Sequence, residues 1–173
     1  MTNTVRSKIG DNAVFQDESA ILNSAKAEFE IMIDIDRIAK AKADIFSVYG
    51  QIENVIKVGK EGFLSDLKNP LALKYLLIEA VEAIADICQH LLAKIKGIPC
   101  DGYVDCILKT GGEGIITASL ANKLRRLADL RNNLIHRYWI IDDEQLYVQT
   151  TENKEDLHEF INQINSFLSS LKN

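Results

Sequence analysis

Apolar side chains recur at every third or fourth position along most of the chain, which is the spacing of one face of an α-helix. The pattern is clear in residues 34–58, between Pro70 and Gly97, in a stretch beginning near Thr117, and in residues 153–171. Only two prolines and nine glycines occur among the 173 residues, so long stretches carry no helix breaker. Four helices in succession predict an all-α fold, a bundle of four to five helices.

The helix predicted between Pro70 and Gly97 carries signals at both ends. Asn69 can cap it, Pro70 suits its first position, and Gly97 followed by Pro99 suits its end. Its residues are apolar nearly all round, which is typical of a helix at the centre of a bundle or in an oligomer interface. Three polar residues interrupt it at intervals of four and therefore lie along one face: Glu82, Asp86 and His90.

The segments outside these four helices have weaker patterns. Residues 1–33 form an N-terminal extension, in which we expect residues 1–17 to be disordered and 18–33 to be helical, so that the bundle domain comprises residues 34–173. A short apolar stretch at 103–108 precedes a glycine-rich turn at 111–114. After an acidic turn at 142–144, Leu146 to Val148 are expected to form a brief extended segment.

Composition narrows the setting of the protein. No run of about 18 apolar residues occurs, so no membrane span is expected, and the polar N-terminus does not resemble a secretory signal. The three cysteines include no CxxC pair, and Cys88 lies in an apolar helical run, where a buried free thiol is expected. These features predict a protein of the reducing cytoplasm, without a zinc or disulfide framework.

The helix that begins near Thr117 breaks its own pattern. Its apolar stripe follows steps of four and three through Leu120, Leu124, Leu127 and Leu134, so positions 131 and 138 should also be apolar. They are Arg131 and Tyr138. An inward arginine is costly because guanidinium cannot lose its charge. Either it serves a functional site, or it reaches the edge of the bundle or a helix carboxylate such as Asp86.

Charge is concentrated in the same helix, although the net charge of the chain is −5. Between residues 121 and 138 the sequence has five basic residues and one acidic residue, a surplus of four positive charges. The basic residues are Lys123, Arg125, Arg126, Arg131 and Arg137, and the acidic residue is Asp129. Such a segment could bind phosphates or simply be a solvated helix face. His136 follows Arg131 by five residues, about 140° around an ideal helix, so the two side chains diverge unless the helix end distorts. They could still meet one substrate beside a cleft or across a dimer interface.

The segment Arg131, four residues, His136, one residue, Tyr138 resembles the RX4HXY signature of the HepT-like branch of the HEPN family. The resemblance extends over roughly residues 35–171, and includes the helix with Glu82 and the residues 112–116. Because the asparagine after the arginine and the order of the helices also agree, the match is more specific than an RX4H pattern alone. Residues 1–33 go beyond what is typical of that family.

The resemblance implies a fold and a function. Its members are helical bundles of HEPN type that form homodimers, and many are metal-independent ribonuclease toxins of toxin–antitoxin modules. The usual partner is a minimal nucleotidyltransferase (MNT) antitoxin, which can neutralise the toxin by attaching AMP to the motif tyrosine. The resemblance therefore implies an RNA substrate, catalytic roles for Arg131 and His136, a supporting role for Asn132, and modification of Tyr138. No cofactor and no metal are implied.

The chemistry of these residue types agrees with that implication. Cleavage of RNA without a metal uses the substrate's own 2′-hydroxyl as the nucleophile, so the protein needs to move protons and stabilise a phosphorane. Imidazole exchanges a proton near neutral pH and can act as base or acid. Guanidinium offers a rigid fork of donors to phosphate oxygens. Each chain has one motif histidine, so a two-fold dimer could place two sites in a shared groove.

Three further interpretations stay open at this point. Glu82, Asp86 and His90 could bind a metal, although a more plausible role is that one acid, which we assign as Asp86, orients Arg131 or His136 from the facing helix. Trp139 is expected in the core or an interface rather than as a platform for stacking bases. The chain could also be a catalytically silent partner that docks to and regulates a nucleotidyltransferase.

Overall fold

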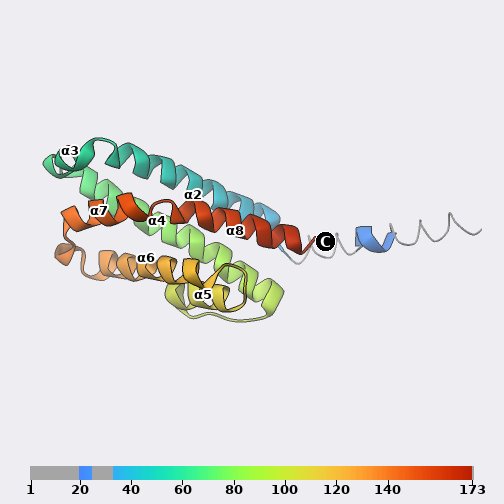
Figure 1. The fold of residues 1–173 in the computed structure, drawn as a ribbon. Helices are drawn as coiled ribbons and strands as arrows, with labels where there is room; N and C mark the ends of the chain where they lie inside the picture. Colours follow the sequence, from blue (N-terminus) through green and yellow to red (C-terminus); the bar gives the residue numbers. More distant parts are fainter. Residues whose placement is uncertain (1–19, 25–32, 173) are drawn as a thin grey trace, which may run out of the picture. The chain divides into compact units, whose positions relative to one another are not determined.

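The computed structural model describes residues 20–24 and 33–172 (Figure 1). The chain divides into two compact units, residues 1–34 and residues 35–173. In the first unit, residues 20–24 are helical. The predicted disorder of residues 1–17 lies outside the described residues, and so does most of the helix predicted at 18–33.

The second unit is a bundle of α-helices with no strand among its described residues. α2, α4, α6 and α8 are the long helices and run alongside one another, while α3 and α7 lie together at one end of the bundle (Figure 1). The predicted all-α bundle is therefore confirmed. The helices are α2 (Ile35–Ile56), α3 (Gly59–Ser65), α4 (Lys68–Leu91), α5 (Gly102–Gly112), α6 (Ala118–His136), α7 (Asp143–Asn153) and α8 (Asp156–Ser170).

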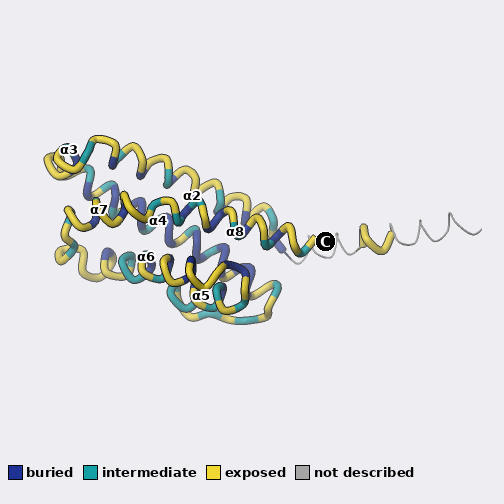
Figure 2. The backbone as a smooth tube through the Cα atoms, viewed as in Figure 1, coloured by how far each residue is buried: buried dark blue, intermediate teal, exposed yellow. Residues whose placement is uncertain are grey.

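α4 is the central helix, as its apolar sequence predicts. Figure 2 shows it as the most continuously buried element, and it packs against α2, α5 and α6. Burial of one large aliphatic side chain stabilises a fold by about 1.5–3 kcal/mol, so this helix is the main source of core stability. Its fully buried residues include Leu73, Ala80, Val81, Ile84, Cys88 and Leu91.

Only the C-terminal end of α4 lies where the sequence predicts it. The helix begins at Lys68, so Leu67 occupies the N-cap position and Asn69 lies within the first turn. The prediction that Asn69 caps the helix is wrong, and its side-chain amide instead donates to the carbonyl of Gly62 at 3.3 Å. At the other end, a π-helical turn, η1 (Leu92–Lys96), leads to Gly97, whose φ of 65° ends the helix as predicted.

One segment to which the sequence assigned no structure, and one predicted as extended, belong to helices. The apolar stretch 103–108 lies in α5, and Leu146 to Val148 lie in α7, which Asp142 caps by accepting the amide of Gln145 at 2.8 Å. The prediction of an extended segment failed because the buried residues of α7, Leu146 and Thr150, make only one helical repeat. Three consecutive apolar residues are compatible with a strand when the repeat is that short.

α5 packs closely against the start of α6. A Cβ atom on Gly111 would lie 2.5 Å from the Cβ of Ala121, so only glycine allows this approach. The chain then turns through Gly114, with a φ of 71°, and Thr117 caps α6 by accepting the amide of Leu120 at 3.3 Å. These contacts fix α5 beside the helix that carries the candidate site.

Candidate functional site

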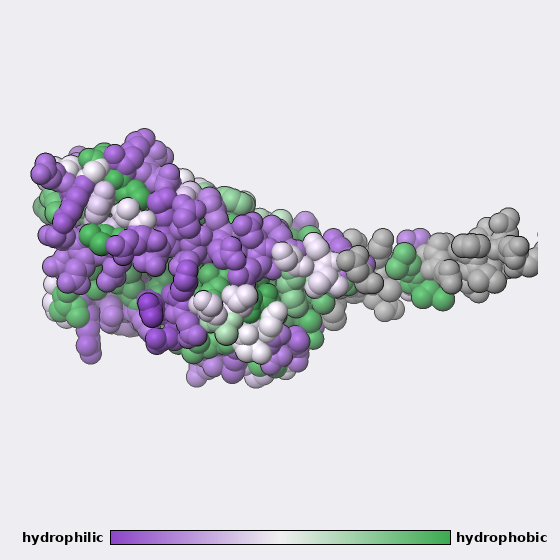
Figure 3. All heavy atoms as spheres, in the orientation of Figure 1, coloured by the Kyte–Doolittle hydropathy of each residue, from purple (hydrophilic) through white to green (hydrophobic). Residues whose placement is uncertain are grey.

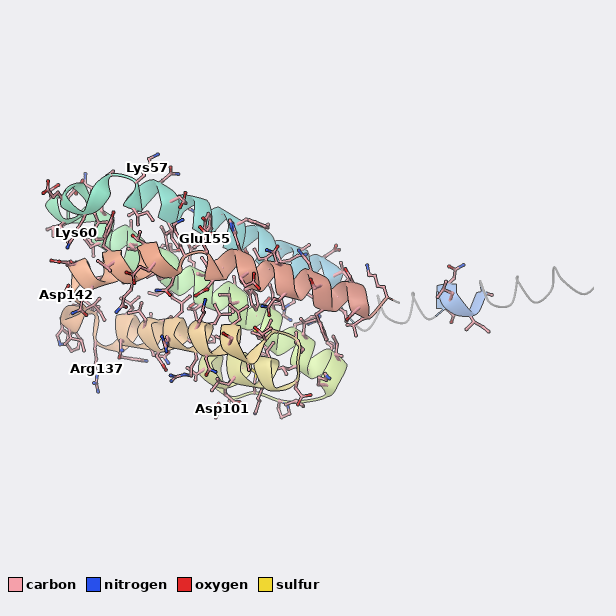
Figure 4. The ribbon with its side chains drawn as sticks, in the orientation of Figure 1. Lys57, Lys60, Asp101, Arg137, Asp142 and Glu155 are labelled. Carbon is pink, nitrogen blue, oxygen red and sulfur yellow. A yellow bond between two sulfur atoms is a disulfide. The ribbon has the colours of Figure 1, made fainter. Side chains whose placement is uncertain are left out.

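α6 is α-helical through His136, so Arg131, Asn132 and His136 all lie in its last two turns. Arg137 then leaves the helical conformation, with φ −145° and ψ 39°, and projects away from the bundle (Figure 4). Tyr138 belongs to a 3₁₀ turn, η2 (Tyr138–Ile140). The expectation that Tyr138 continues the face of Arg131 is therefore wrong, because it requires a helix that extends past residue 136.

The side chain of Arg131 contacts residues of two other helices. Its side chain is 17% exposed, and Nη2 donates to Oε1 of Glu82 on α4 at 3.1 Å. On α5, the ring of Tyr103 lies with its centroid 4.5 Å from the Cζ atom of Arg131. An ion pair and a cation–π contact together compensate for moving the guanidinium partly out of water. Nε of Arg131 is buried and has no hydrogen-bond partner.

Asp86 does not take the place predicted for it. Nε of Arg37 on α2 donates to both carboxylate oxygens of Asp86, at 3.1 and 3.0 Å. This bond to Arg37 is the main cause that lowers the pKa of Asp86 below its usual value. The acid that contacts Arg131 is instead Glu82, one helical turn earlier on α4. The third polar residue of that row, His90, is buried. Among the described residues no cluster of three potential metal ligands occurs.

A small cavity of about 370 Å³ adjoins the partners of Arg131. A disulfide between Cys100 and Cys106 contributes to its wall, a bond that the expectation of no disulfide framework did not foresee. Cys88 is the buried free thiol that the sequence predicts, and burial raises its pKa to about 12. The cavity is lined by Glu82, Ala85, Asp86, Gln89, Cys100, Gly102, Tyr103 and Cys106.

Carboxylates of the folded chain neutralise part of the positive charge that the sequence concentrates in and just after α6. Lys123 pairs with Asp156 of α8 at 2.8 Å, and Arg125 with Asp129 at 3.0 Å. With Arg131 bound to Glu82, three of the five cations have carboxylate partners. The face shown in Figure 3 is correspondingly mixed, with hydrophilic ridges along α2 and α8 and apolar atoms between α8 and α6. The segment is thus no continuous cationic surface.

The residues that follow Arg131 are open to solvent. Asn132 and His136 are exposed, Tyr138 is 62% exposed, and Trp139 is 69% exposed. The rings of Tyr138 and Trp139 meet edge to face with centroids 5.3 Å apart. Trp139 is therefore not a core residue of this chain, which leaves an interface or a stacking surface as its role.

Sequence reasoning missed two contributors to the site, Tyr103 and the disulfide. Tyr103 lies between Cys100 and Cys106, and the spacing of six between these two cysteines was the available signal for the disulfide.

Of the helices in the described residues, none is long and apolar enough to cross a membrane.

Comparison with known proteins adds three findings. The family model described as "Ribonuclease HepT-like" matches residues 45–164. The chain is 28% identical over 115 residues to a tRNA nuclease HepT of Aphanizomenon flos-aquae, covering 66% of this chain and 78% of that protein. It is 31% identical over 110 residues to a putative RNase of Archaeoglobus fulgidus, covering 61% of this chain and 82% of that one.

A solved structure has the same fold. It is the tri-AMPylated HEPN toxin of Shewanella oneidensis in complex with an MNT antitoxin, and it superposes with a TM-score of 0.71. The superposition covers 76% of this chain and 98% of that toxin, at 23% sequence identity. The matched regions contain α6 and the helices that surround Arg131.

Proposed function

The chain belongs to the HepT-like ribonuclease family, and from this we propose that it is a metal-independent RNA endonuclease, the toxin of a toxin–antitoxin module. One observation carries the proposal: α6 brings a partly buried arginine with fixed partners and a solvent-exposed histidine to its last two turns. Arg131 and His136 are the catalytic residues in this proposal, and Asn132 supports them.

The proposed reaction uses neither a metal nor a cofactor. A base removes the proton of a ribose 2′-hydroxyl, and the oxygen forms a bond to the adjacent phosphorus. The bond from phosphorus to the 5′-oxygen breaks, and an acid protonates the leaving oxygen. Arg131 stabilises the extra negative charge on the phosphorane through its terminal Nη donors, since its Nε is buried. The products are a 2′,3′-cyclic phosphate and a 5′-hydroxyl.

The relatives suggest the substrate and the partner. One is named a tRNA nuclease, so we propose tRNA as the substrate class. Because the structurally similar toxin is AMPylated and bound to an MNT antitoxin, we propose a nucleotidyltransferase antitoxin for this chain, with Tyr138 as the modified residue. We also place the protein in the cytoplasm, where tRNA is found, although a reducing cytoplasm does not favour a disulfide such as that between Cys100 and Cys106.

Incubation of the purified chain with total tRNA in EDTA tests this function. We expect cleavage that EDTA does not reduce, because the nucleophile belongs to the substrate and the protons move through side chains. Treatment of the fragments with polynucleotide kinase and phosphatase should identify 5′-hydroxyl and cyclic phosphate ends.

Strict dependence of cleavage on magnesium would contradict the proposed mechanism. A chain that cleaves no RNA, does not stop growth when expressed alone, and still binds a nucleotidyltransferase would instead be the silent regulatory partner.

Exposed apolar residues support the further proposal of a homodimer. Leu67, just before α4, and Leu71 and Tyr75 in its first two turns lie along one face and are mostly exposed, although most apolar residues of that helix are buried. The ion pair of Lys74 with Asp143, at 2.7 Å, joins this part of α4 to the start of α7. A second exposed apolar group therefore lies at the same end of the bundle, just before α7: Ile135, Tyr138, Trp139 and Ile140.

Light scattering at micromolar concentration should give a mass of about 39 kDa, twice the 19.4 kDa of one chain. Leu71→Glu should shift the mass toward the monomer and reduce cleavage, because a carboxylate in a packed interface is costly. Val58→Glu, at an exposed apolar position outside this surface, is the control and should remain dimeric. A wild-type monomer under these conditions would remove the model of two sites in a shared groove.

A further inference from the structure

Tyr103 and Arg131 form the one arginine–aromatic contact among the described residues. Tyr103 lies in the first turn of α5 and Arg131 near the end of α6, 28 residues later. A ring 4.5 Å from Cζ lies in the range where the attraction between a cation and an aromatic face is strong. Since the arginine side chain is mostly buried, water weakens this attraction less than it would at an open surface.

Several bonds fix the position of Tyr103. The disulfide between Cys100 and Cys106 closes a short loop around it. Within that loop, the amide of Asp101, labelled in Figure 4 at the start of α5, donates to the carboxylate of Asp105 at 2.8 Å. Lys109, in the last turn of α5, donates to the carbonyl of Pro99 at 2.9 Å and so ties the helix to the segment before it. The disulfide and these hydrogen bonds therefore fix the backbone that carries the ring.

Tyr103 and Glu82 constrain different aspects of the guanidinium. Glu82 binds one Nη2 donor, which holds the end of the group but still allows it to turn about that bond. The ring of Tyr103 lies under Cζ at 4.5 Å and so covers the group from one side, where it can limit how the group turns. Nε faces buried surroundings, so only the Nη end can meet a phosphate. The direction in which the Nη atoms of Arg131 point depends on the orientation of the guanidinium plane.

We propose that Tyr103 is a positioning residue of the ribonuclease, whose aromatic face holds the guanidinium plane of Arg131 for the phosphate of the RNA. The inference rests on the proposed function and adds a residue outside the RX4HXY segment. The ring carries the effect and the hydroxyl does not. Preorganisation of this kind lowers the barrier because the donor need not be ordered during the reaction.

Three variants test the proposal on the full chain. Tyr103→Leu removes the aromatic face but keeps apolar volume, and we expect kcat to fall about tenfold, with KM changed less. Tyr103→Phe retains the face and should stay within about twofold of the wild type. Phe46→Leu makes the same kind of change on an exposed aromatic of α2, outside the site, and should leave cleavage unchanged.

A second measurement reports the contact without using activity. In a chain labelled with ¹⁵N-arginine, the Nε–H signal of Arg131 is assigned by its loss in Arg131→Lys. We expect it to exchange slowly with water and to be shifted by the ring of Tyr103. Tyr103→Phe should preserve this signal, and Tyr103→Leu should move it to the position of an unstacked arginine, while circular dichroism and the melting midpoint show that both variants fold.

The outcomes separate the two proposals. A wild-type chain with the shifted signal but without RNA cleavage would overturn the proposed function and with it the role of Tyr103. A wild-type chain that cleaves RNA but lacks the shifted signal would overturn the positioning role alone. That role also fails if Tyr103→Leu cleaves as fast as the wild type or faster, or if Tyr103→Phe is as slow as Tyr103→Leu.

Discussion

His136→Ala should remove RNA cleavage, with a loss of about a hundredfold or more, because general acid–base catalysis typically contributes 10²–10⁴-fold. The side chain is exposed on the last residue of α6, so its removal opens no cavity and leaves no buried group without a partner. The fold should therefore persist, with an unchanged helical circular dichroism signal. The measurement is the initial rate of tRNA cleavage in EDTA, together with growth of cells that express the variant.

Arg131→Lys is the companion variant. Lysine keeps a positive charge beside Glu82, so the ion pair is retained, but an ammonium cannot offer two coplanar donors to a phosphorane. We expect a loss of about 10²–10³-fold, as for other removed oxyanion donors. Arg126→Lys makes the same exchange on an exposed arginine of the same helix and should have little effect. Near wild-type cleavage by His136→Ala or Arg131→Lys would show that the assigned roles are wrong.

The second large effect concerns control by the antitoxin. Tyr138→Phe should remain toxic yet escape neutralisation, because its ring has no oxygen to attack the α-phosphorus of ATP and release pyrophosphate. In the wild type the phenol is 62% exposed and accessible to a transferase. Each AMP would add about 329 Da and a phosphate beside Arg137, where it would compete with RNA and block its approach. Mass spectrometry with and without the antitoxin and ATP measures this directly.

A matched control distinguishes modification from binding. Tyr75→Phe removes the hydroxyl of another tyrosine that is exposed in the single chain, keeps the apolar ring that the proposed dimer surface would use, and should leave AMPylation and neutralisation intact. If the antitoxin neutralises Tyr138→Phe as readily as the wild type, without a gain of mass, then inhibition comes from binding alone and Tyr138 is not the control point.

The sequence was sufficient to predict the all-α bundle, the central α4 and the segment that carries Arg131 and His136. These features depend on residues close together along the chain, and helical periodicity repeats every 3.6 residues. The spacing also identified Arg131 as an inward charge that needs a partner. Where local evidence was too short, as in α7, the same method failed, because one repeat of buried residues does not separate a helix from a strand.

Only the tertiary structure decided which groups meet Arg131. Glu82 and Asp86 lie on the same face of α4, yet the packing of α6 and α2 on either side directs one to Arg131 and the other to Arg37. Tyr103 reaches the guanidinium because α5 lies tightly against α6, an approach that depends on Gly111 meeting Ala121. Partners 49 and 28 residues away in sequence share no local pattern, since side-chain contacts between helices follow from how whole helices pack.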